Sequence, residues 1–223
     1  MSLYARPSIE APVFHDADGR VIDYGNRWGA GPPPEETYSV ETHLERFAPT
    51  HTIAHALIAH LRDSYDADVE EGVEAAADLL HGPAPAVVHA VRVRPNDPAC
   101  ASLTFVFTAY PGIHLHAGLL NDFQYPICGC DACDSTWSAE ADEMERQVFA
   151  VVAGRYRETV EQRGSDPWVG YAFTYLDGGS SGGSREQGMP ADRLEAATSI
   201  LRNRPDEWAA WPTAPLSSAR APA

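Results

Sequence analysis

Lysine is absent from the 223-residue chain, so all 16 of its basic residues are arginine. A catalytic Schiff base and the phosphate-binding loop of nucleotide hydrolases both require a lysine amine, and the sequence excludes both. Basic residues are also scarce beside the 32 Asp and Glu, and the formal net charge is −16. Because such a chain repels polyanions and anionic membrane surfaces, we expect neither nucleic acid nor a membrane as a partner.

Long apolar runs are missing as well. No segment approaches the roughly 20 apolar residues that span a bilayer, and the first residues lack the apolar run of a secretory signal. Of the four cysteines, Cys128, Cys130 and Cys133 lie close together, which makes a poor disulfide framework. We therefore expect a cytoplasmic protein. The acidic surface suits solubility, and a basic protein is the class of partner left open.

Hydrophobic periodicity divides the chain into helices and strands. Apolar residues recur at helical spacing over 50–65, 69–80, 139–163 and 191–202. Alternating or β-rich runs predict strands over 87–93, 102–110, 113–120 and 168–175. The turn Pro111-Gly112 makes the two middle strands antiparallel neighbours.

Two segments show neither the helical spacing nor the alternation of a strand. Residues 177–188 read DGGSSGGSREQG and predict a flexible loop, and residues 212–223, rich in Pro, Ala and Ser, predict a disordered tail. The fold expected from these elements is α+β, a mostly antiparallel sheet with helices packed on one face. The length suits one domain over residues 1–211.

The segment Cys128-Gly129-Cys130-Asp131-Ala132-Cys133 is the strongest chemical signal. Thiolates are soft ligands, and a short turn containing glycine lets several of them converge on one ion. Structural zinc takes four Cys or His ligands in a tetrahedron, and this segment supplies three. Neighbouring acidic residues favour a bound cation too, since they disfavour unpaired thiolates. We therefore predict zinc at Cys128, Cys130 and Cys133.

The fourth ligand has to come from elsewhere in the chain. His116 and His114 are the nearest candidates, and their spacing places both on one face of a predicted strand. A zinc ion held by one of them would join that strand to the start of the helix over 139–163. Cys100, which precedes the neighbouring strand, is a weaker candidate.

Three other interpretations of the cysteines remain open. They can form a reduced turn without metal, or Cys130 and Cys133 can form a redox pair, since C-x-x-C is a redox spacing. An open zinc site with a bound water would be catalytic. His51 and His55 also have the spacing of a metalloprotease helix, but the glutamate that acts as general base there is missing.

Four segments are together similar to a known family. They read VIDYGNRWG, ETYSVETHLERFAPTHTIAHALIAHL, LTFVFTAYPGIHLHAGL and PICGCDACD, and CGCDACD is the most specific part. On these segments, most of residues 10–175 resembles a family of uncharacterised actinobacterial proteins. The resemblance implies a genuine folded domain of unknown function and implies no substrate.

The sequence leads to three hypotheses and leaves open whether the protein is an enzyme. The first is a binding or interaction module with a structural zinc site. The second is a metal-dependent hydrolase, with zinc at the cysteines or at His51 and His55. The third is a thiol redox protein.

Overall fold

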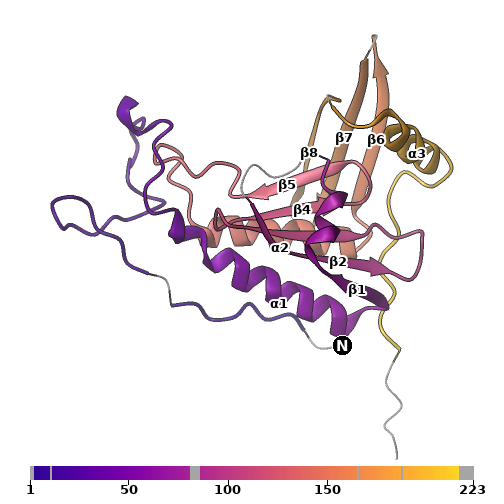
Figure 1. Cartoon of the computed structure of the whole chain (residues 1–223), viewed down its shortest axis with the longest axis horizontal. Coiled ribbons are helices and arrows are strands. Elements are labelled where there is room, and N and C mark those ends of the chain that lie inside the picture. The colour runs from indigo at the N-terminus through magenta and orange to yellow at the C-terminus, as the bar shows by residue number, and fades with distance from the viewer. Residues whose placement is uncertain (1–2, 11, 81–85, 165, 187, 216–223) are drawn as a thin grey trace, which may run out of the picture.

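The computed structural model describes residues 3–10, 12–80, 86–164, 166–186 and 188–215. Within these residues, two antiparallel sheets stand side by side (Figure 1). The first sheet is a meander of β1 (Ala67–Glu71), β2 (Val87–Pro95), β3 (Leu103–Thr108), β4 (Ile113–Ala117) and β5 (Asn121–Tyr125), in that order. The second sheet consists of β6 (Tyr156–Arg163), β7 (Asp166–Tyr175) and β8 (Gly178–Arg185). The fold is therefore α+β, as expected.

Three α-helices and three short 3-10 helices complete the described structure. The α-helices are α1 (Pro49–Ser64), α2 (Trp137–Val152) and α3 (Ala191–Arg202). The 3-10 helices are η1 (Glu35–Thr37), η2 (Leu44–Phe47) and η3 (Val73–Asp78). None of the described helices combines the length and the apolar character that a membrane crossing requires.

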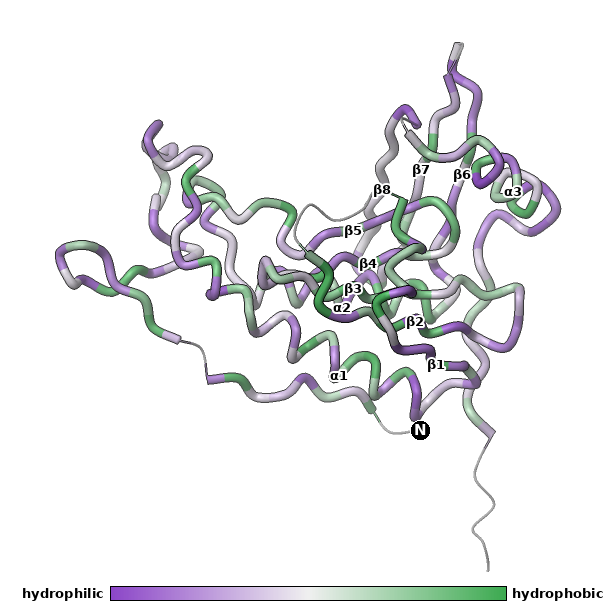
Figure 2. The backbone as a smooth tube through the Cα atoms, viewed as in Figure 1, coloured by the Kyte–Doolittle hydropathy of each residue, from purple (hydrophilic) through white to green (hydrophobic). Residues whose placement is uncertain are grey.

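The central strand β3 of the first sheet is buried on both faces. Along β3, Leu103, Phe105 and Phe107 belong to one buried cluster with residues of α1 and α2. The alternate residue Val106 faces the other way and packs with Ala75 of η3. Each aromatic side chain buried in this way contributes roughly 1.5–3 kcal/mol. The mixture of apolar and polar residues along α1 can be followed in Figure 2.

The predicted helix over 139–163 is correct only in its first half. Helix α2 ends at Val152, and Gly154 then adopts a φ of 69° beside the backbone of Ala210. The chain continues as β6, in which Tyr156 is fully buried and stacks on Phe173 of β7 at a centroid distance of 4.9 Å. This pairing overrides the helical propensity of the segment, and the prediction for its second half was wrong.

Two further predictions were wrong. The expected helix over 69–80 is the end of β1 followed by η3, because β1 pairs with β2 along its whole length. The expected loop over 177–188 contains β8, which pairs with β7 from Gly178 to Arg185. A Cβ on Gly183 would lie 2.6 Å from Trp168 Nε1, so glycine permits this close pairing.

The C-terminal segment contacts the end of α1. Asp66 N donates to Pro212 O at 2.9 Å, and Ala214 N donates to Ser64 O at 3.0 Å. Residues 216–223, the rest of the tail predicted to be disordered, lie outside the described residues.

Candidate metal centre

The three clustered cysteines converge in the loop between β5 and α2. The sulfurs of Cys128, Cys130 and Cys133 all lie within 4.8 Å of one another. The sulfurs of Cys130 and Cys133 are 3.3 Å apart, and all three cysteines are free of disulfides. Zinc–sulfur bonds of about 2.3 Å in a tetrahedron place sulfurs roughly 3.8 Å apart. The cluster therefore has the spacing that one metal ion requires.

One side of the cluster faces solvent. Cys130 is buried, Cys128 is half-buried and Cys133 is exposed. A metal ion can therefore reach the sulfurs directly, while the buried thiol anchors the site to the protein.

The buried carboxylate of Asp131 fixes the middle of the loop. It accepts hydrogen bonds from Thr42 N at 3.1 Å and from Thr42 Oγ1 at 2.8–2.9 Å. Arg27 Nη1 lies 3.8 Å away, and Asp131 N donates to Val40 O at 2.8 Å. Asp131 is 5% exposed, so it joins the loop to the N-terminal segment.

Arg46 and Gly129 hold the first half of the loop. Arg46 is 2% exposed, and its Nη2 donates to Gly129 O at 2.8 Å while its Nη1 donates to Thr42 O. A Cβ on Gly129 would lie 1.6 Å from the hydroxyl of Tyr110, so a larger residue does not fit there. The loop therefore owes its shape to contacts with distant parts of the chain.

The thiols influence one another electrostatically. Burial opposes ionisation of Cys130, but hydrogen bonds from the Cys128 thiol and from the backbone N–H groups of Cys133 and Ser39 prevail and lower its pKa. Hydrogen bonds with the thiols of Cys130 and Cys128 raise the pKa of Cys133 to about 12. A cation would compensate the repulsion among three thiolates and displace their protons.

The two histidines predicted as ligands do share one face of β4, as expected. Neither imidazole belongs to the group of ligand atoms that the three sulfurs form. Nδ1 of His116 instead lies 2.7 Å from Oδ1 of Asp122 on β5, and His114 is half-buried opposite Val106. Cys100 is also outside the group, since its thiol donates to Ala210 O at 3.3 Å.

The other histidine pair lies on α1, against the first sheet. His51 Nε2 lies 3.0 Å from Gly112 O, and His55 stacks on Phe107 with ring centroids 4.4 Å apart. Burial lowers the pKa of both histidines. In the part of the chain that the structure describes, no carboxylate completes a three-ligand group with them.

Sequence reasoning missed the residues that shape the loop. Asp131 was seen only as a nearby charge, and its partner Thr42 is 89 positions away. Arg46 gives no local signal, because it is one arginine in an otherwise ordinary segment. A count of Asp and Arg near cysteines cannot identify such contacts, since they depend on the tertiary fold.

We expect Asp131→Ala to lower the free energy of unfolding by about 2 kcal/mol, since it leaves the part-buried N–H of Thr42 without its acceptor. Urea denaturation measures this effect. The matched control is Asp18→Ala, which removes a carboxylate that is 70% exposed and should change stability by less than about 0.5 kcal/mol. Equal urea midpoints for the two variants would show that Asp131 does not hold the loop.

Comparison with known proteins identifies the family of the chain but gives no function for it. Searches of curated proteins and of solved structures find no match. A family model matches residues 10–215, which is nearly the whole chain. The chain therefore belongs to DUF6226, a family of unknown function.

Proposed function

We propose that the protein binds zinc through Cys128, Cys130 and Cys133 and acts as a binding or interaction module. The observation that supports this most directly is the convergence of three sulfurs within 4.8 Å. Thiolates select soft metals, and zinc is the ion that such ligands hold in structural sites. A reducing cytoplasm, expected from the cysteine pattern, would keep the thiols available for the metal.

The proposed metal has a structural role. Contacts of Asp131 and Arg46 already join the loop to residues 40–46, and zinc would close the exposed side that these contacts leave open. Zinc takes four ligands, and the described residues supply three of them as one group. In this proposal a side chain of a protein partner supplies the fourth ligand, because it can reach the metal from the solvent-exposed side of the cluster at Cys133.

Metal content and free thiols test this proposal. The protein is purified under reducing conditions, and we expect about one zinc per chain with the three sulfurs protected from thiol reagents until a chelator is added. Cys133→Ser removes one ligand and should lose the metal.

Cys100→Ser is the matched control, because its thiol lies apart from the cluster, against Ala210 O. It should retain the full zinc content. Equal zinc loss in the two variants, or a reduced protein that takes up no zinc, would overturn the proposal.

A second candidate function is thiol redox chemistry. The sulfurs of Cys130 and Cys133 are 3.3 Å apart, and the pKa of Cys130 is lowered. Their oxidation would form one S–S bond and pass two electrons and two protons to an acceptor disulfide. A metal-free protein whose Cys130 and Cys133 thiols are rapidly converted to a disulfide by oxidised glutathione, with release of two molecules of reduced glutathione, would favour this function over zinc binding.

A further inference from the structure

A row of polar side chains crosses the first sheet on the face away from α1. Each of the five strands contributes one residue, and each residue is paired in register with the next. In strand order, the row is Glu70, Arg92, Thr104, His116 and Asp122. A sheet face covered by other elements is normally apolar, because a buried polar group costs free energy unless it is hydrogen-bonded or paired. The contacts that each member of this row makes are therefore informative.

Asp78 of η3 binds one end of this row. Its carboxylate accepts from Arg92 Nε at 2.6 Å and from Arg92 Nη2 at 2.7 Å, and also from Thr104 Oγ1 at 2.5 Å. Glu70 accepts from Arg92 Nη1 at 2.6 Å. These contacts neutralise Arg92 and hold it in one orientation.

The other end of the row is a histidine–carboxylate pair. Nδ1 of His116 lies 2.7 Å from Oδ1 of Asp122, whose Oδ2 accepts from Leu80 N at 2.8 Å. Both carboxylate oxygens are therefore engaged, and the imidazole is fixed through Nδ1. The ring edge that this pair leaves free carries Nε2, and His116 lines a cavity beside the row.

That cavity has a volume of about 270 Å³ and lies between the first sheet and α3. Water occupies roughly 30 Å³ per molecule in the liquid, so a small organic molecule fits in this space. Its polar lining consists of Asp78, Arg92, Arg94, Ser102, His116 and Arg193, so one carboxylate faces three arginines. Three of the 16 basic residues of a chain with net charge −16 thus line one small cavity.

Among the described residues, two of these arginines, Arg94 and Arg193, form no ion pair with a carboxylate, although Asp68 of β1 lies opposite Arg94 in the sheet register. Arg193 of α3 donates to the backbone oxygens of Leu79, at 3.3 Å, and Asp78, which hold its guanidinium at the wall without neutralising it. Among the described residues, Arg94 forms no ion pair and no hydrogen bond through its side chain. Guanidinium groups bind carboxylates and phosphates through paired hydrogen bonds.

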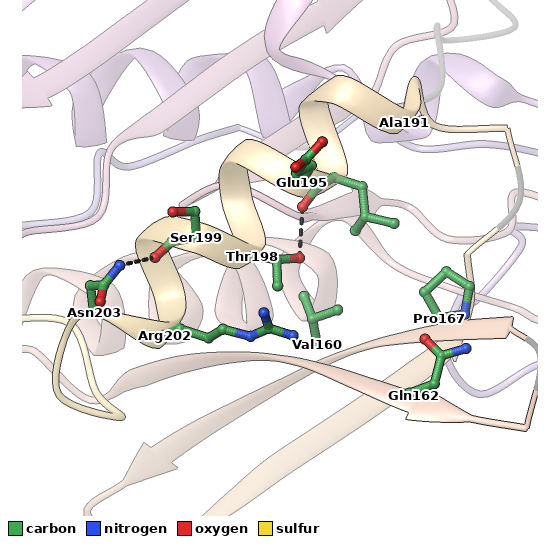
Figure 3. A pocket seen from close by; sticks show the side chains of 10 residues that line it. Val160, Gln162, Pro167, Ala191, Glu195, Thr198, Ser199, Arg202 and Asn203 are labelled. Atoms are coloured by element: carbon green, nitrogen blue, oxygen red, sulfur yellow. Dashed lines mark hydrogen bonds between the residues drawn. The ribbon is translucent and has the colours of Figure 1, made fainter.

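The larger cavity between α3 and β6, about 670 Å³, is lined by one arginine, Arg202, and one carboxylate, Glu195, so the formal charges of its lining cancel (Figure 3). Two of its polar side chains also turn back to their own helix, with Thr198 Oγ1 donating to Leu194 O and Asn203 Nδ2 donating to Ser199 O. The cavity beside the polar row is therefore the better candidate for a charged ligand.

We propose that this cavity binds a small molecule through its oxyanion group, either a phosphate or a carboxylate. Arg94 and Arg193 supply the positive charge, and His116 presents its Nε2 edge to the ligand. Asp78, which itself lines the cavity, holds Arg92 in place, and Asp122 holds His116. This site is independent of the cysteine cluster and of the zinc proposal.

Titration with sodium phosphate and, separately, with sodium citrate tests the proposal, with sodium chloride at matched ionic strength as the blank. Two-dimensional amide NMR of the full chain should show saturable shifts around Arg94, His116 and Arg193, with a Kd of about 1 mM or tighter for one of the two anions. Saturation by phosphate alone or by citrate alone identifies the oxyanion class.

Two substitutions locate the binding. Arg94→Ala should weaken the binding about tenfold, whereas Arg20→Ala, which removes an arginine that is 75% exposed and lies elsewhere, should leave it unchanged. His116→Asn keeps an amide near the position of Nδ1 for Asp122 and deletes Nε2, and it should weaken binding several-fold without unfolding the chain. The proposal is overturned if neither anion gives saturable shifts, or if Arg94→Ala and Arg20→Ala bind alike.

Discussion

Replacing Glu158 by alanine is expected to lower the free energy of unfolding by about 3–5 kcal/mol, because several buried donors would lose their shared acceptor. Glu158 is 4% exposed and lies on β6, between the two sheets. Its carboxylate accepts from Leu120 N at 2.8 Å, from Asn121 Nδ2 at 2.9 Å and from Trp208 Nε1 at 3.0 Å. Leu119 N donates to both oxygens, at 3.2 and 3.0 Å.

The close packing around this carboxylate makes relaxation difficult. A Cβ on Gly118 would lie 2.1 Å from Glu158 Oε2, so the β4–β5 turn is built directly against the side chain. Water cannot easily replace five hydrogen bonds in a cavity enclosed in this way. We therefore expect little of the loss to be recovered by solvent.

Urea denaturation of Glu158→Ala and Glu161→Ala compares the loss of a buried carboxylate with the loss of an exposed carboxylate on the same strand, β6. Glu161 also lies on β6, but its side chain is 53% exposed and, among the described residues, forms an ion pair with Arg163 alone, so its loss should cost less than about 0.5 kcal/mol. Glu158→Gln keeps one carbonyl oxygen as an acceptor and should fall between the two. Similar midpoints for the two alanine variants would contradict the role assigned to Glu158.

Replacing Cys130 by serine is expected to abolish stoichiometric zinc binding and to lower the Tm by about 5–10 °C in the presence of zinc. Cys130 is the buried thiol of the three, so it anchors the ion to the protein. A ligand present at a hundred times its Kd stabilises the folded state by about 2.7 kcal/mol, which sets this range.

Chelation provides the complementary measurement. The wild-type protein after removal of zinc should melt close to Cys130→Ser, and the addition of zinc should restore only the wild type. Cys100→Ser, outside the cluster, should respond to zinc as the wild type does. A Cys130→Ser variant with full zinc content and an unchanged Tm would refute the proposed site.

The sequence predicts those elements whose apolar side chains recur with the period of a helix or of a strand. Helix α1 was recognised because Ile53, Leu57 and Leu61 form a stripe that is fully buried. Strand β8 was missed for the opposite reason, since its sequence GGSSGGSR has no apolar residue to show a period of two. The segment of β6 was predicted to be helical, because what makes it a strand is its pairing with β7, which begins ten positions later in the chain.

The candidate metal site, too, could be predicted from the sequence only in part. The cysteine cluster is local and could be read from six consecutive residues, whereas the ligand beyond it depends on the fold. His116 was a reasonable candidate by spacing, yet the register of β4 and β5 places it beside Asp122. The polar row from Glu70 to Asp122 cannot be seen in a sequence, because its members meet only through four strand pairings.

X-ray absorption spectroscopy at the zinc edge of the purified, reduced protein reports which atoms are bound to the metal, and so shows whether the cysteines hold it. We expect three sulfurs at about 2.3 Å and one lighter atom, nitrogen or oxygen, around the zinc of the wild type. Zinc bound without sulfur, or a reduced protein that holds no zinc even when it is supplied, would contradict the proposed site.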